Sequence, residues 1–463
     1  MLHIYNSLSG KKERFEPIRA GKVSMYVCGI TVYDLCHVGH ARSSLVFDVV
    51  VRALRFLGYD VTYVRNITDI DDKIIRRAHD NGESWQALAD RMIVAMHEDE
   101  RALGLLPPDR EPRATQHIQD MITLIQTLQE KGLAYQADNG DMCFSVEDYD
   151  QYGALSQRVL DELQAGARIA DHSGKRSPHD FVLWKHAKPD EPSWDSPFGA
   201  GRPGWHIECS AMSRAELGQP FDIHGGGMDL KFPHHENEIA QSQGACGGVY
   251  ANTWMHSGLL TINGEKMSKS LGNFVTIRDA LGDNDPEVLR YLMIASHYRS
   301  PVNYSKDQLE QSKASLTRLY TALRDIDLVP MNELDLTAFP EYQAFVDALC
   351  DDIHVPEALS VLFGLAKKVN RERESDPKKA TQLASLLKGL GAVLGLLQQD
   401  PPDFLRGELS EGADADTIEA LIADRQAARA AKDFQKADAI RDELAAMGVE
   451  IEDKGSETVW RLQ

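Results

Sequence analysis

Two apolar, β-branched segments with an amphipathic stretch between them constrain the fold of this chain most. Residues 23–28 and 61–67 have the composition of buried strands, and residues 41–57 have a helical pattern that Gly58 closes. Strand, turn, helix and strand in this order form a βαβ unit, which requires a parallel sheet. Ligands of such sheets lie at the carboxyl ends of the strands, where CGITVYDLCHVGH and NITDIDDK are found. The sequence therefore predicts an α/β domain with a site on these two segments.

The middle of the chain departs from this rhythm. Residues 84–103 and 114–131 have helical patterns, and the dipeptide Asn139-Gly140 marks a hairpin. Residues 172–204 are rich in Pro, Gly, Trp and Asp and show little periodicity. This composition predicts an insertion or a set of surface loops.

The α/β pattern resumes at residues 221–242, and a second hairpin turns at Asn263-Gly264. Beyond about residue 305, apolar residues recur at three- and four-residue spacing, which predicts a helical bundle. Residues 398–416 read as a polar linker. A further helical pattern and a short β-like tail follow it, so we expect a small C-terminal α+β domain.

Length and composition bound the class of protein. A chain of 463 residues is too long for one typical core and predicts two to four domains. We find no apolar run long enough to span a bilayer and no apolar core of a signal peptide at the start, so we expect a cytoplasmic protein without a membrane partner. Six cysteines without even spacing do not suggest a disulfide framework. The net charge of −21 argues against wholesale coating of nucleic acid but allows a local basic track.

Two short motifs far apart in the chain suit a nucleotide. His37-Val38-Gly39-His40 lies where the first strand turns into a helix, and a helix N-terminus favours phosphate. Lys266 and Lys269 lie in GEKMSKS, where two ammonium groups would neutralise a triphosphate. Each motif alone is a weak signal, since a helix-start histidine is more often structural and a lysine pair is more often a solvated turn. No Walker-type motif is present, so nucleotide binding needs another geometry.

Together, HVGH and KMSKS resemble the signatures of class I aminoacyl-tRNA synthetases, which bind ATP between them on a Rossmann-like fold. The family pattern reads His-Ile-Gly-His, so Val38 is a conservative departure. The resemblance implies that His37 and His40 are catalytic and hold phosphates, and that Lys266 and Lys269 clamp them. Gly39 and Met267 are implied as further ATP contacts.

Other blocks narrow the resemblance to the cysteinyl-tRNA synthetase family over essentially the whole length. They are YVCGITVYDLCHVGH, VRNITDIDDKI, GWHIECSAM, DIHGGGMDLKFPHHENEIAQS and the C-terminal AARAAKDFQKADAIRDEL with VWR. The implied parts are a first catalytic half (1–115), a connective insertion (116–200), a second catalytic half (201–250), the KMSKS and stem-contact region (251–304), a helical bundle (305–400) and an anticodon-recognition domain (401–463).

The resemblance implies one zinc ion per chain on Cys28, Cys209, His234 and Glu238. Residue chemistry supports this independently, because Pro233 suits the first turn of a helix and places His234 and Glu238 on one face at i and i+4. Two thiolates, an imidazole and a carboxylate are a suitable zinc set. A one-residue shift would substitute His235 for His234. Zinc prefers sulfur to oxygen, so it would select cysteine over serine where shape alone is worth about 1–3 kcal/mol.

Further site residues follow by position in the matched motifs. The implied amino-acid pocket is Gly29, Thr68, Trp205 and His224, and Asp229 receives the ATP ribose while Gly225, Gly226 and Gly227 allow close backbone approach. Core packing of Trp205 and a turn cap by Asp229 are the alternatives. For the remaining cysteines the default is a small buried apolar residue; these are Cys36, Cys143, Cys246 and Cys350.

Basic and aromatic residues near the C-terminus suit an RNA contact. Phosphate contacts with an aromatic ring for base stacking would fit an anticodon-reading domain. Solvated helix faces are the alternative, because residues 401–463 hold 15 acidic and 8 basic side chains. The candidates are Arg425, Arg429, Lys432, Lys436, Arg441, Trp460 and Arg461.

The sequence thus predicts a ligase that forms cysteinyl-adenylate from cysteine and ATP and transfers it to cysteine tRNA. Magnesium with ATP is implied by the family, and a monomer is expected. One alternative is a cysteine ligase of mycothiol biosynthesis, which transfers cysteine to an amino sugar and lacks an anticodon domain. Another is a non-catalytic tRNA- or zinc-binding relative.

Overall fold

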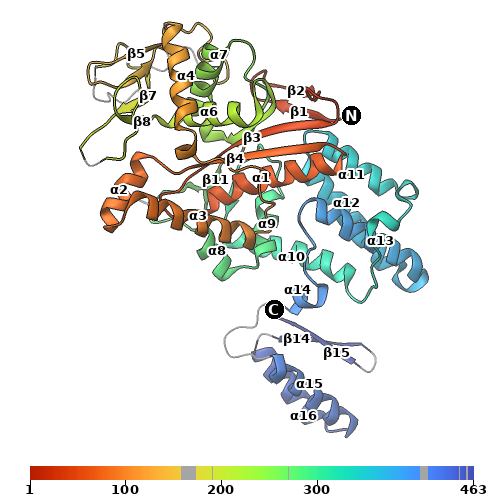
Figure 1. Ribbon diagram of the computed structural model, residues 1–463. Helices are drawn as coiled ribbons and strands as arrows, with labels where there is room; N and C mark the ends of the chain where they lie inside the picture. Colours follow the sequence, from red (N-terminus) through yellow and green to blue (C-terminus); the bar gives the residue numbers. More distant parts are fainter. Residues whose placement is uncertain are drawn as a thin grey trace. The chain divides into compact units, whose positions relative to one another are not determined.

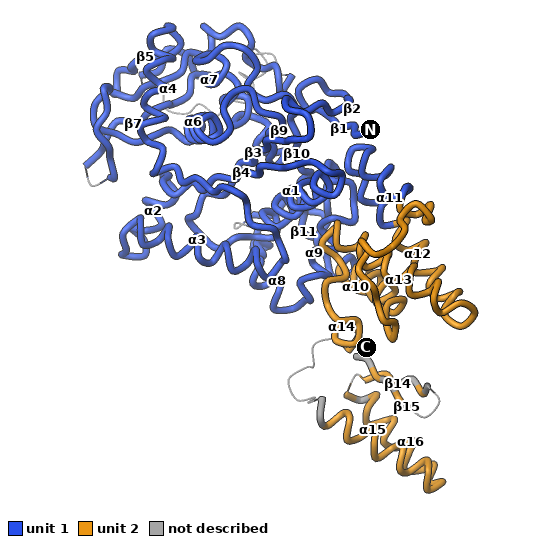
Figure 2. Tube along the Cα trace, turned by 45° about the vertical axis from the view of Figure 1, so that its right-hand side comes forward, with its two compact units in different colours: residues 1–308, 343–359 blue, residues 309–342, 360–463 orange. Residues whose placement is uncertain are grey.

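The computed structural model describes residues 1–157, 174–189, 191–268, 271–406, 415–447, 449–454 and 457–462. The chain divides into two compact units, coloured separately in Figure 2. Unit 1 comprises residues 1–308 and 343–359, and unit 2 comprises residues 309–342 and 360–463. No helix among the described residues combines the length and apolar character that crossing a membrane requires.

A four-stranded parallel sheet organises unit 1, as the βαβ pattern predicted. Its order is β10-β9-β3-β4, and α1 (Val38–Phe56) connects the two strands of the predicted unit. In Figure 1, α1 lies against one face of this sheet and α6 (Trp205–Leu217) against the other. The strands are β3 (Lys22–Thr31), β4 (Asp60–Thr68), β9 (Phe221–Gly227) and β10 (Ala251–Ser257).

Because all four strands are parallel, their carboxyl ends lie along one edge of the sheet. Near this end β3 loses regular register with β4 between Val27 and Ile30. Gly29 lies in the irregular stretch, and its N–H donates to Asn66 Oδ1 at 2.8 Å. A Cβ at residue 29 would lie 1.7 Å from the Asn66 carbonyl oxygen. Only glycine therefore fits the approach of the two strands next to the predicted site.

The predicted insertion contains more regular structure than its composition indicated. Strands β5 (Ala134–Gln136) and β6 (Met142–Phe144) form the expected hairpin. The prediction of surface loops over 172–204 is wrong in part, because β7 (Phe181–His186) and β8 (Gly201–Pro203) continue the same antiparallel sheet. Helices of this part of unit 1 are α2 (Asp72–Asn81), α3 (Trp85–Ala102), the turn η1 (Ala114–Gln116), α4 (Ile118–Glu130) and α7 (Glu236–Cys246).

A small sheet carries the start of the KMSKS segment (residues 266–270). Its order is β12-β11-β13, with β11 and β12 antiparallel about the predicted Asn263-Gly264 turn. Both turn residues have positive φ, 49° and 83°, which this dipeptide tolerates well. The elements are β11 (Leu260–Ile262), β12 (Glu265–Lys266), β13 (Val302–Tyr304), α8 (Ile277–Asp283) and α9 (Pro286–Ile294), with the hairpin β1 (His3–Asn6) and β2 (Lys11–Arg14) at the N-terminus.

Helices dominate the chain after residue 305, as the spacing of apolar residues predicted. In unit 2, the Tyr320 and Phe404 rings stack with centroids 4.1 Å apart. The predicted linker 398–416 is wrong in part, because it contains the short helix α14 (Pro401–Arg406). The other elements are α10 (Lys306–Leu323), η5 (Met331–Glu333), η6 (Leu336–Ala338), α11 (Pro340–Cys350), α12 (Val355–Ser375) and α13 (Pro377–Val393).

The C-terminal residues form two helices and a hairpin, as expected. They are α15 (Ala415–Ala430), α16 (Phe434–Ala446), β14 (Val449–Lys454) and β15 (Glu457–Leu462). Their shared core consists of Ile418, Ile422, Ile440, Leu444, Val449 and Trp460.

We predict that Gly29→Ala destabilises unit 1 by at least about 1–3 kcal/mol, the usual cost of overpacking, since the obstructing atom belongs to the backbone. Gly282→Ala is the matched control, because a Cβ there meets no atom within 4 Å. Thermal unfolding followed by circular dichroism checks both. Equal melting temperatures for the two variants would contradict the close approach of β3 and β4.

We also predict an acid-sensitive contribution from Asp453. The Arg425 side chain, which donates to Asp453 at 2.8 and 3.0 Å, lowers the pKa of this carboxyl below its usual value. Stability from a depressed carboxyl pKa is complete above the unfolded value of about 3.9 and is lost as pH falls through the folded pKa. Amide exchange of residues 449–454 should therefore be faster in Asp453→Asn than in wild type at pH 7. The two rates should begin to converge only below about pH 4, as the wild-type carboxyl becomes protonated, and a constant ratio would rule the ion pair out as the cause.

Candidate functional site

The HVGH motif begins α1 in an unusual way, because its two histidines cap the helix reciprocally. His37 Nδ1 accepts from His40 N–H and His40 Nδ1 accepts from His37 N–H, each at 3.3 Å. The two rings stack with centroids 3.6 Å apart. In neutral rings whose Nδ1 accepts, the proton is on Nε2, so both outer nitrogens are donors. Burial, and then His37 and Lys73, lower the pKa of His40 to about 3.

The KMSKS segment lies against this motif. Thr276 pairs with His37 in an isolated bridge, in which Val38 N–H donates to Val275 O at 3.1 Å and Ile277 N–H to Cys36 O at 2.9 Å. A Cβ at Gly39 would lie 3.4 Å from Met267 Cε and 3.0 Å from the His37 ring, so Met267 and the start of α1 approach each other closely there.

Lys266 ends β12 and its side chain is exposed. Asn273, which the sequence did not single out, binds two backbone groups in the first three residues of the segment. Its side chain accepts from Ser268 N–H at 2.8 Å and donates to Lys266 O at 3.2 Å. Lys269 lies outside the described residues.

The four predicted metal ligands converge from distant parts of the chain. Their donor atoms all lie within 4.8 Å of one another; they are Cys28, Cys209, His234 and Glu238. Cys28 comes from β3 and Cys209 from α6. His234 lies in the turn η3 (Lys231–His235), directly before α7, which carries Glu238. The predicted i, i+4 relation holds, since His234 Nε2 lies 3.1 Å from Glu238 Oε1.

The two oxygens of Glu238 have different partners. Oε1 faces Cys28 Sγ at 3.2 Å and the His234 ring. Oε2 lies 2.8 Å from His224 Nε2 and accepts from the Tyr250 hydroxyl at 3.0 Å. One oxygen is thus available to a cation while the other is fixed, an arrangement common around protein metal sites.

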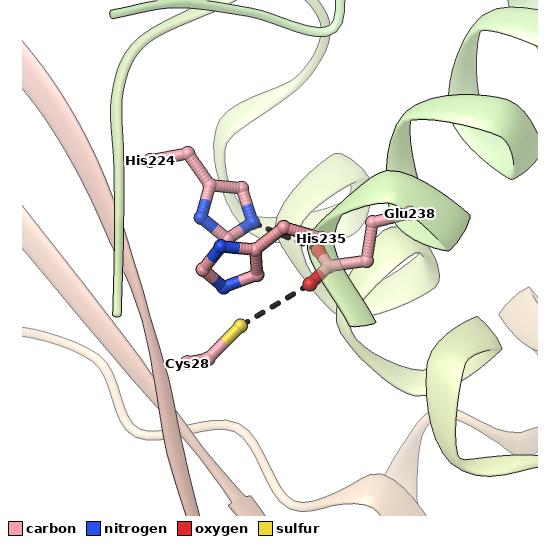
Figure 3. A group of neighbouring side chains, drawn as sticks. All are labelled: Cys28, His224, His235 and Glu238. Carbon is pink, nitrogen blue, oxygen red and sulfur yellow. Dashed lines mark hydrogen bonds and ion pairs between the residues drawn. The ribbon is translucent and has the colours of Figure 1, made fainter. Parts of the chain in front are cut away.

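A second group of four shares two of these residues, and Figure 3 shows it. Cys28, His224, His235 and Glu238 also have donor atoms within 4.8 Å of one another. In this group His224 already bonds Oε2 of Glu238, the outer oxygen, which faces away from Cys28 and His234. His235 Nδ1 lies 2.9 Å from His256 Nε2. The predicted set brings a second thiol, Cys209, whose sulfur lies 3.6 Å from that of Cys28. The donors therefore fit zinc better in the predicted set.

Electrostatics also prepare the predicted set for a cation. Burial raises the pKa of the Cys28 thiol well above its usual range. Burial opposes ionisation of Cys209 too, but the hydrogen bond from Cys28 and the nearby His234 outweigh it and lower the pKa of Cys209 to about 6. Against burial, the carboxylate of Glu238 raises the pKa of His234 to about 10. A divalent cation would take the place of the protons on Cys28 and His234, because a metal binds thiolate and neutral imidazole, and it would offset the charges of Cys209 and Glu238.

The predicted amino-acid pocket surrounds the same group. Asn66 Oδ1 accepts from Gly29 N–H and lies 3.6 Å from Cys209 Sγ. Thr68, at the end of β4, donates to the buried carboxylate of Glu208 at 2.8 Å. Sequence reasoning missed Asn66 and Glu208, although both lie within the quoted motifs.

Trp205 and His224 differ in their exposure to solvent. The Trp205 ring is 38% exposed and stacks on His234 with centroids 4.2 Å apart, so it is not a core residue. His224 is fully buried, stacks on Trp254 and bonds Glu238. Trp205 thus offers an exposed aromatic surface beside the proposed metal, while His224 lies behind it.

The glycines that end β9 have packing reasons of their own. A Cβ at Gly225 would lie 2.4 Å from the Phe47 ring of α1, and one at Gly226 would lie 2.7 Å from the His235 ring. A Cβ at Gly227 would lie 2.4 Å from Asp229 Oδ1. Asp229 follows in the turn η2 (Met228–Leu230) at the carboxyl end of the sheet. All three glycines therefore allow close contacts within the protein.

Some of the C-terminal candidates bind acidic side chains, whereas others are exposed. Arg425 is largely buried and, with Arg429, binds Asp453. Trp460 is 6% exposed and donates to Glu419 at 2.9 Å, so base stacking by this ring, as the sequence suggested, is corrected to core packing. Arg441 lies 3.6 Å from Asp438. Lys432 and Lys436 are exposed, and Arg461 lies in β15 with a side chain outside the described residues.

The four remaining cysteines do not share one environment. Cys36 and Cys143 are buried, as predicted, and burial raises their pKa to about 12 and about 11. The prediction is wrong for Cys246, which is exposed, and Cys350 is only partly buried. All six cysteines are free.

Comparison with known proteins identifies the family. A family described as the class I (C) tRNA synthetase catalytic domain matches residues 14–314, a DALR domain matches residues 344–398, and a cysteinyl-tRNA ligase anticodon binding domain matches residues 411–461. Cysteine–tRNA ligase of Thioalkalivibrio sulfidiphilus (strain HL-EbGR7) is 57% identical over 461 residues, which cover all of both chains. The chain belongs to the cysteine–tRNA ligase family.

A second relative supports this family assignment, and a solved structure supports the fold. Cysteine–tRNA ligase of Azotobacter vinelandii (strain DJ / ATCC BAA-1303) is 57% identical over 462 residues, covering 100% of this chain and 99% of the other. Among solved structures, methionyl-tRNA synthetase of Mycobacterium tuberculosis in complex with methionyl-adenylate aligns with a TM-score of 0.56 at 16% identity. That alignment covers 81% of this chain and 89% of the other, and it shows the shared class I fold.

We predict that Cys209→Ser and His234→Asn each lower zinc affinity by more than the roughly 10–100-fold that loss of a supporting residue costs. His235→Asn should retain zinc, because its ring faces His256 rather than Cys209. Inductively coupled plasma mass spectrometry after dialysis against a weak chelator measures the content. Cys143→Ser, a buried cysteine outside the cluster, is the control. Zinc retained by His234→Asn and lost by His235→Asn would assign the second set instead.

Proposed function

We propose that the chain activates cysteine with ATP and transfers the cysteinyl group to the 3′-terminal adenosine of cysteine tRNA. The observation that carries this proposal is the convergence of Cys28, Cys209, His234 and Glu238 at the edge of the sheet where HVGH begins α1. A thiol-selecting group and a phosphate-binding helix start are therefore close enough to serve one reaction. Full-length similarity to cysteine–tRNA ligases supports the same conclusion.

Selection of the amino acid is the first step. A zinc ion held by these four residues would supply a sulfur-preferring Lewis acid that stabilises a thiolate more than a hydroxyl. Gly29, Thr68 and Trp205 surround the position that the rest of the amino acid would take. His224 orients Glu238 through the oxygen that faces away from the cluster.

Adenylation is the second step, and it uses the residues proposed to bind ATP. The carboxylate oxygen of cysteine attacks the α-phosphorus, the bond from that phosphorus to the bridging oxygen breaks, and pyrophosphate leaves. The Nε2–H groups of His37 and His40 donate to phosphate oxygens, and Lys266 and Lys269 neutralise the charge on the leaving group. Asp229 binds the ribose hydroxyls of ATP, and Gly227 leaves space for the nucleotide beside it. Gly39 and Met267 also contact ATP. ATP is expected to bring Mg²⁺.

Transfer needs no covalent enzyme intermediate. A hydroxyl of the terminal adenosine attacks the carbonyl carbon of the adenylate, and AMP leaves with the electron pair of the mixed anhydride bond. Orientation and charge stabilisation supply the acceleration. The protein's contribution is to hold the two reactants against the same sheet edge.

Contact with the anticodon is proposed for the C-terminal residues 415–462. Lys432 and Lys436 are exposed, and between them Phe434 is 63% exposed at the start of α16. An exposed ring between two cations suits stacking on an unpaired base, worth about 1–3 kcal/mol. Phe434 takes the role that the sequence analysis assigned to Trp460. We further propose that the chain is divided into the six parts given above, is a monomer and lies in the cytoplasm.

The rival amino-sugar ligase is disfavoured by one observation. Such an amino-sugar ligase is expected to lack an anticodon domain, whereas residues 411–461 match the anticodon binding domain of cysteinyl-tRNA ligases. A non-catalytic role is disfavoured by the intact reciprocal caps of HVGH and the docked KMSKS segment.

We predict cysteine-dependent ATP–pyrophosphate exchange, followed by charging of bulk tRNA with labelled cysteine. Serine should support exchange far less, because a hydroxyl gains little from zinc. Exchange without charging would favour the amino-sugar ligase. Absence of exchange from the zinc-loaded protein would remove the proposed function altogether.

A further inference from the structure

Arg42 is a buried cation with an unusual set of partners. It lies in α1 two residues after His40 and is 1% exposed. Its Nη1 donates to Met293 O, and its Nη2 lies 3.1, 2.9 and 3.0 Å from the carbonyl oxygens of His297, Tyr298 and Ser300. In the described part of the chain, all of its hydrogen-bond acceptors are backbone carbonyls.

These carbonyls belong to one continuous segment. Met293 lies in the last turn of α9, where helix carbonyls lack intrahelical partners and the dipole favours a cation. The segment then runs through residues 297–300 to β13. Figure 1 shows α1, α9 and β11 near one another in unit 1. Arg42 therefore joins the helix that begins with HVGH to the entrance of β13.

The same segment supports the strand that leads to the KMSKS segment. Gly258 N–H donates to Tyr298 O at 2.7 Å, and Val302 N–H donates to Leu259 O at 2.9 Å. A Cβ at Gly258 would lie 2.1 Å from Ser300 O, so the two segments are in close contact. Gly258 and Leu259 lead directly into β11, which pairs with β12 and Lys266. The Tyr298 carbonyl thus accepts from both Arg42 and Gly258.

The chain is consequently held to α1 both before and after the KMSKS segment. The bridge between His37 and Thr276, described above, lies after the segment. At its N-terminal end, the chain of contacts runs from Arg42 through Tyr298 to β11 and β12. Removal of Arg42 would remove this side-chain link on the N-terminal side of the segment, while the bridge at Thr276 persists.

We propose that Arg42 is a positioning residue for adenylation, which sets the place of Lys266 relative to His37 and His40. This inference rests on the proposed function, because it assigns Arg42 a part in the same reaction. Arg42 does not touch the substrate. It acts through Tyr298, β11 and β12 on a lysine whose charge meets the leaving pyrophosphate.

The test is a double-mutant cycle between Arg42 and Lys266 in cysteine-dependent ATP–pyrophosphate exchange. Arg42→Met should lower kcat by about 10–100-fold, the effect of a small misplacement of a catalytic group. The KM for cysteine should stay within about twofold, since the cysteine pocket is built from other elements. Arg42→Lys, which keeps a cation with fewer donors, should recover part of the loss.

The deciding measurement is the effect of Arg42→Met in a Lys266→Ala background. If Arg42 acts through Lys266, its effect should shrink at least about fivefold there, because interacting residues are not additive. Arg290, also 1% exposed, provides the matched control, since it links α9 to Asp48 of α1 and to the carbonyl oxygens of Leu103 and Gly104. The Met and Lys substitutions at Arg290 should be additive with Lys266→Ala.

The outcomes separate the inference from the proposed function. A wild-type protein without exchange would refute the proposed function. An active wild type in which Arg42 and Lys266 variants are additive would overturn the positioning role, as would equal coupling of Arg290. If Arg42→Met fails to fold, the same cycle with Arg42→Lys decides the question.

Discussion

The burial of one carboxylate, Glu238, governs the arrangement around the site. A carboxylate with no solvent contact is costly unless donors or cations surround it. Its partners come from β3, β9, the turn η3 and the segment before β10, so the charge is stabilised only when these elements meet. The fold places them at one sheet edge, and His224 and Tyr250 satisfy the outer oxygen. The inner oxygen is left for the cation that the cluster of thiols and imidazole implies.

Sequence reasoning predicted the parallel sheet because its strands are continuous apolar runs. It failed on β7 and β8 because both strands are short, and β8 consists of glycine, arginine and proline, a composition typical of loops. At the site, the relation of His234 to Glu238 was predictable, since helical spacing fixes it. The contacts of Tyr250 and His224 with Glu238 were not, because they depend on how α7 packs against β9 and the start of β10.

The C-terminal residues illustrate a different limit. From composition alone, arginines and a tryptophan near the end of the chain suggest an exposed surface that binds RNA. Trp460 instead bonds Glu419, which lies 41 residues earlier, and Arg425 bonds Asp453, which lies 28 residues later. Such long-range pairing withdraws a side chain from the surface, and local sequence does not show it. Phe434 escaped notice because its exposure depends on the same packing.

The reciprocal caps of His37 and His40 have a consequence for product release. Each Nδ1 accepts from a backbone N–H, so the two rings would meet ATP in the proposed reaction as neutral hydrogen-bond donors rather than as fixed cations. In the proposed reaction, full positive charge on the protein side comes from lysines of β12 and the residues after it. The groups that bind the nucleotide are therefore different from those that bind pyrophosphate. Withdrawal of the lysines alone would free the pyrophosphate while the adenylate stays bound for the tRNA.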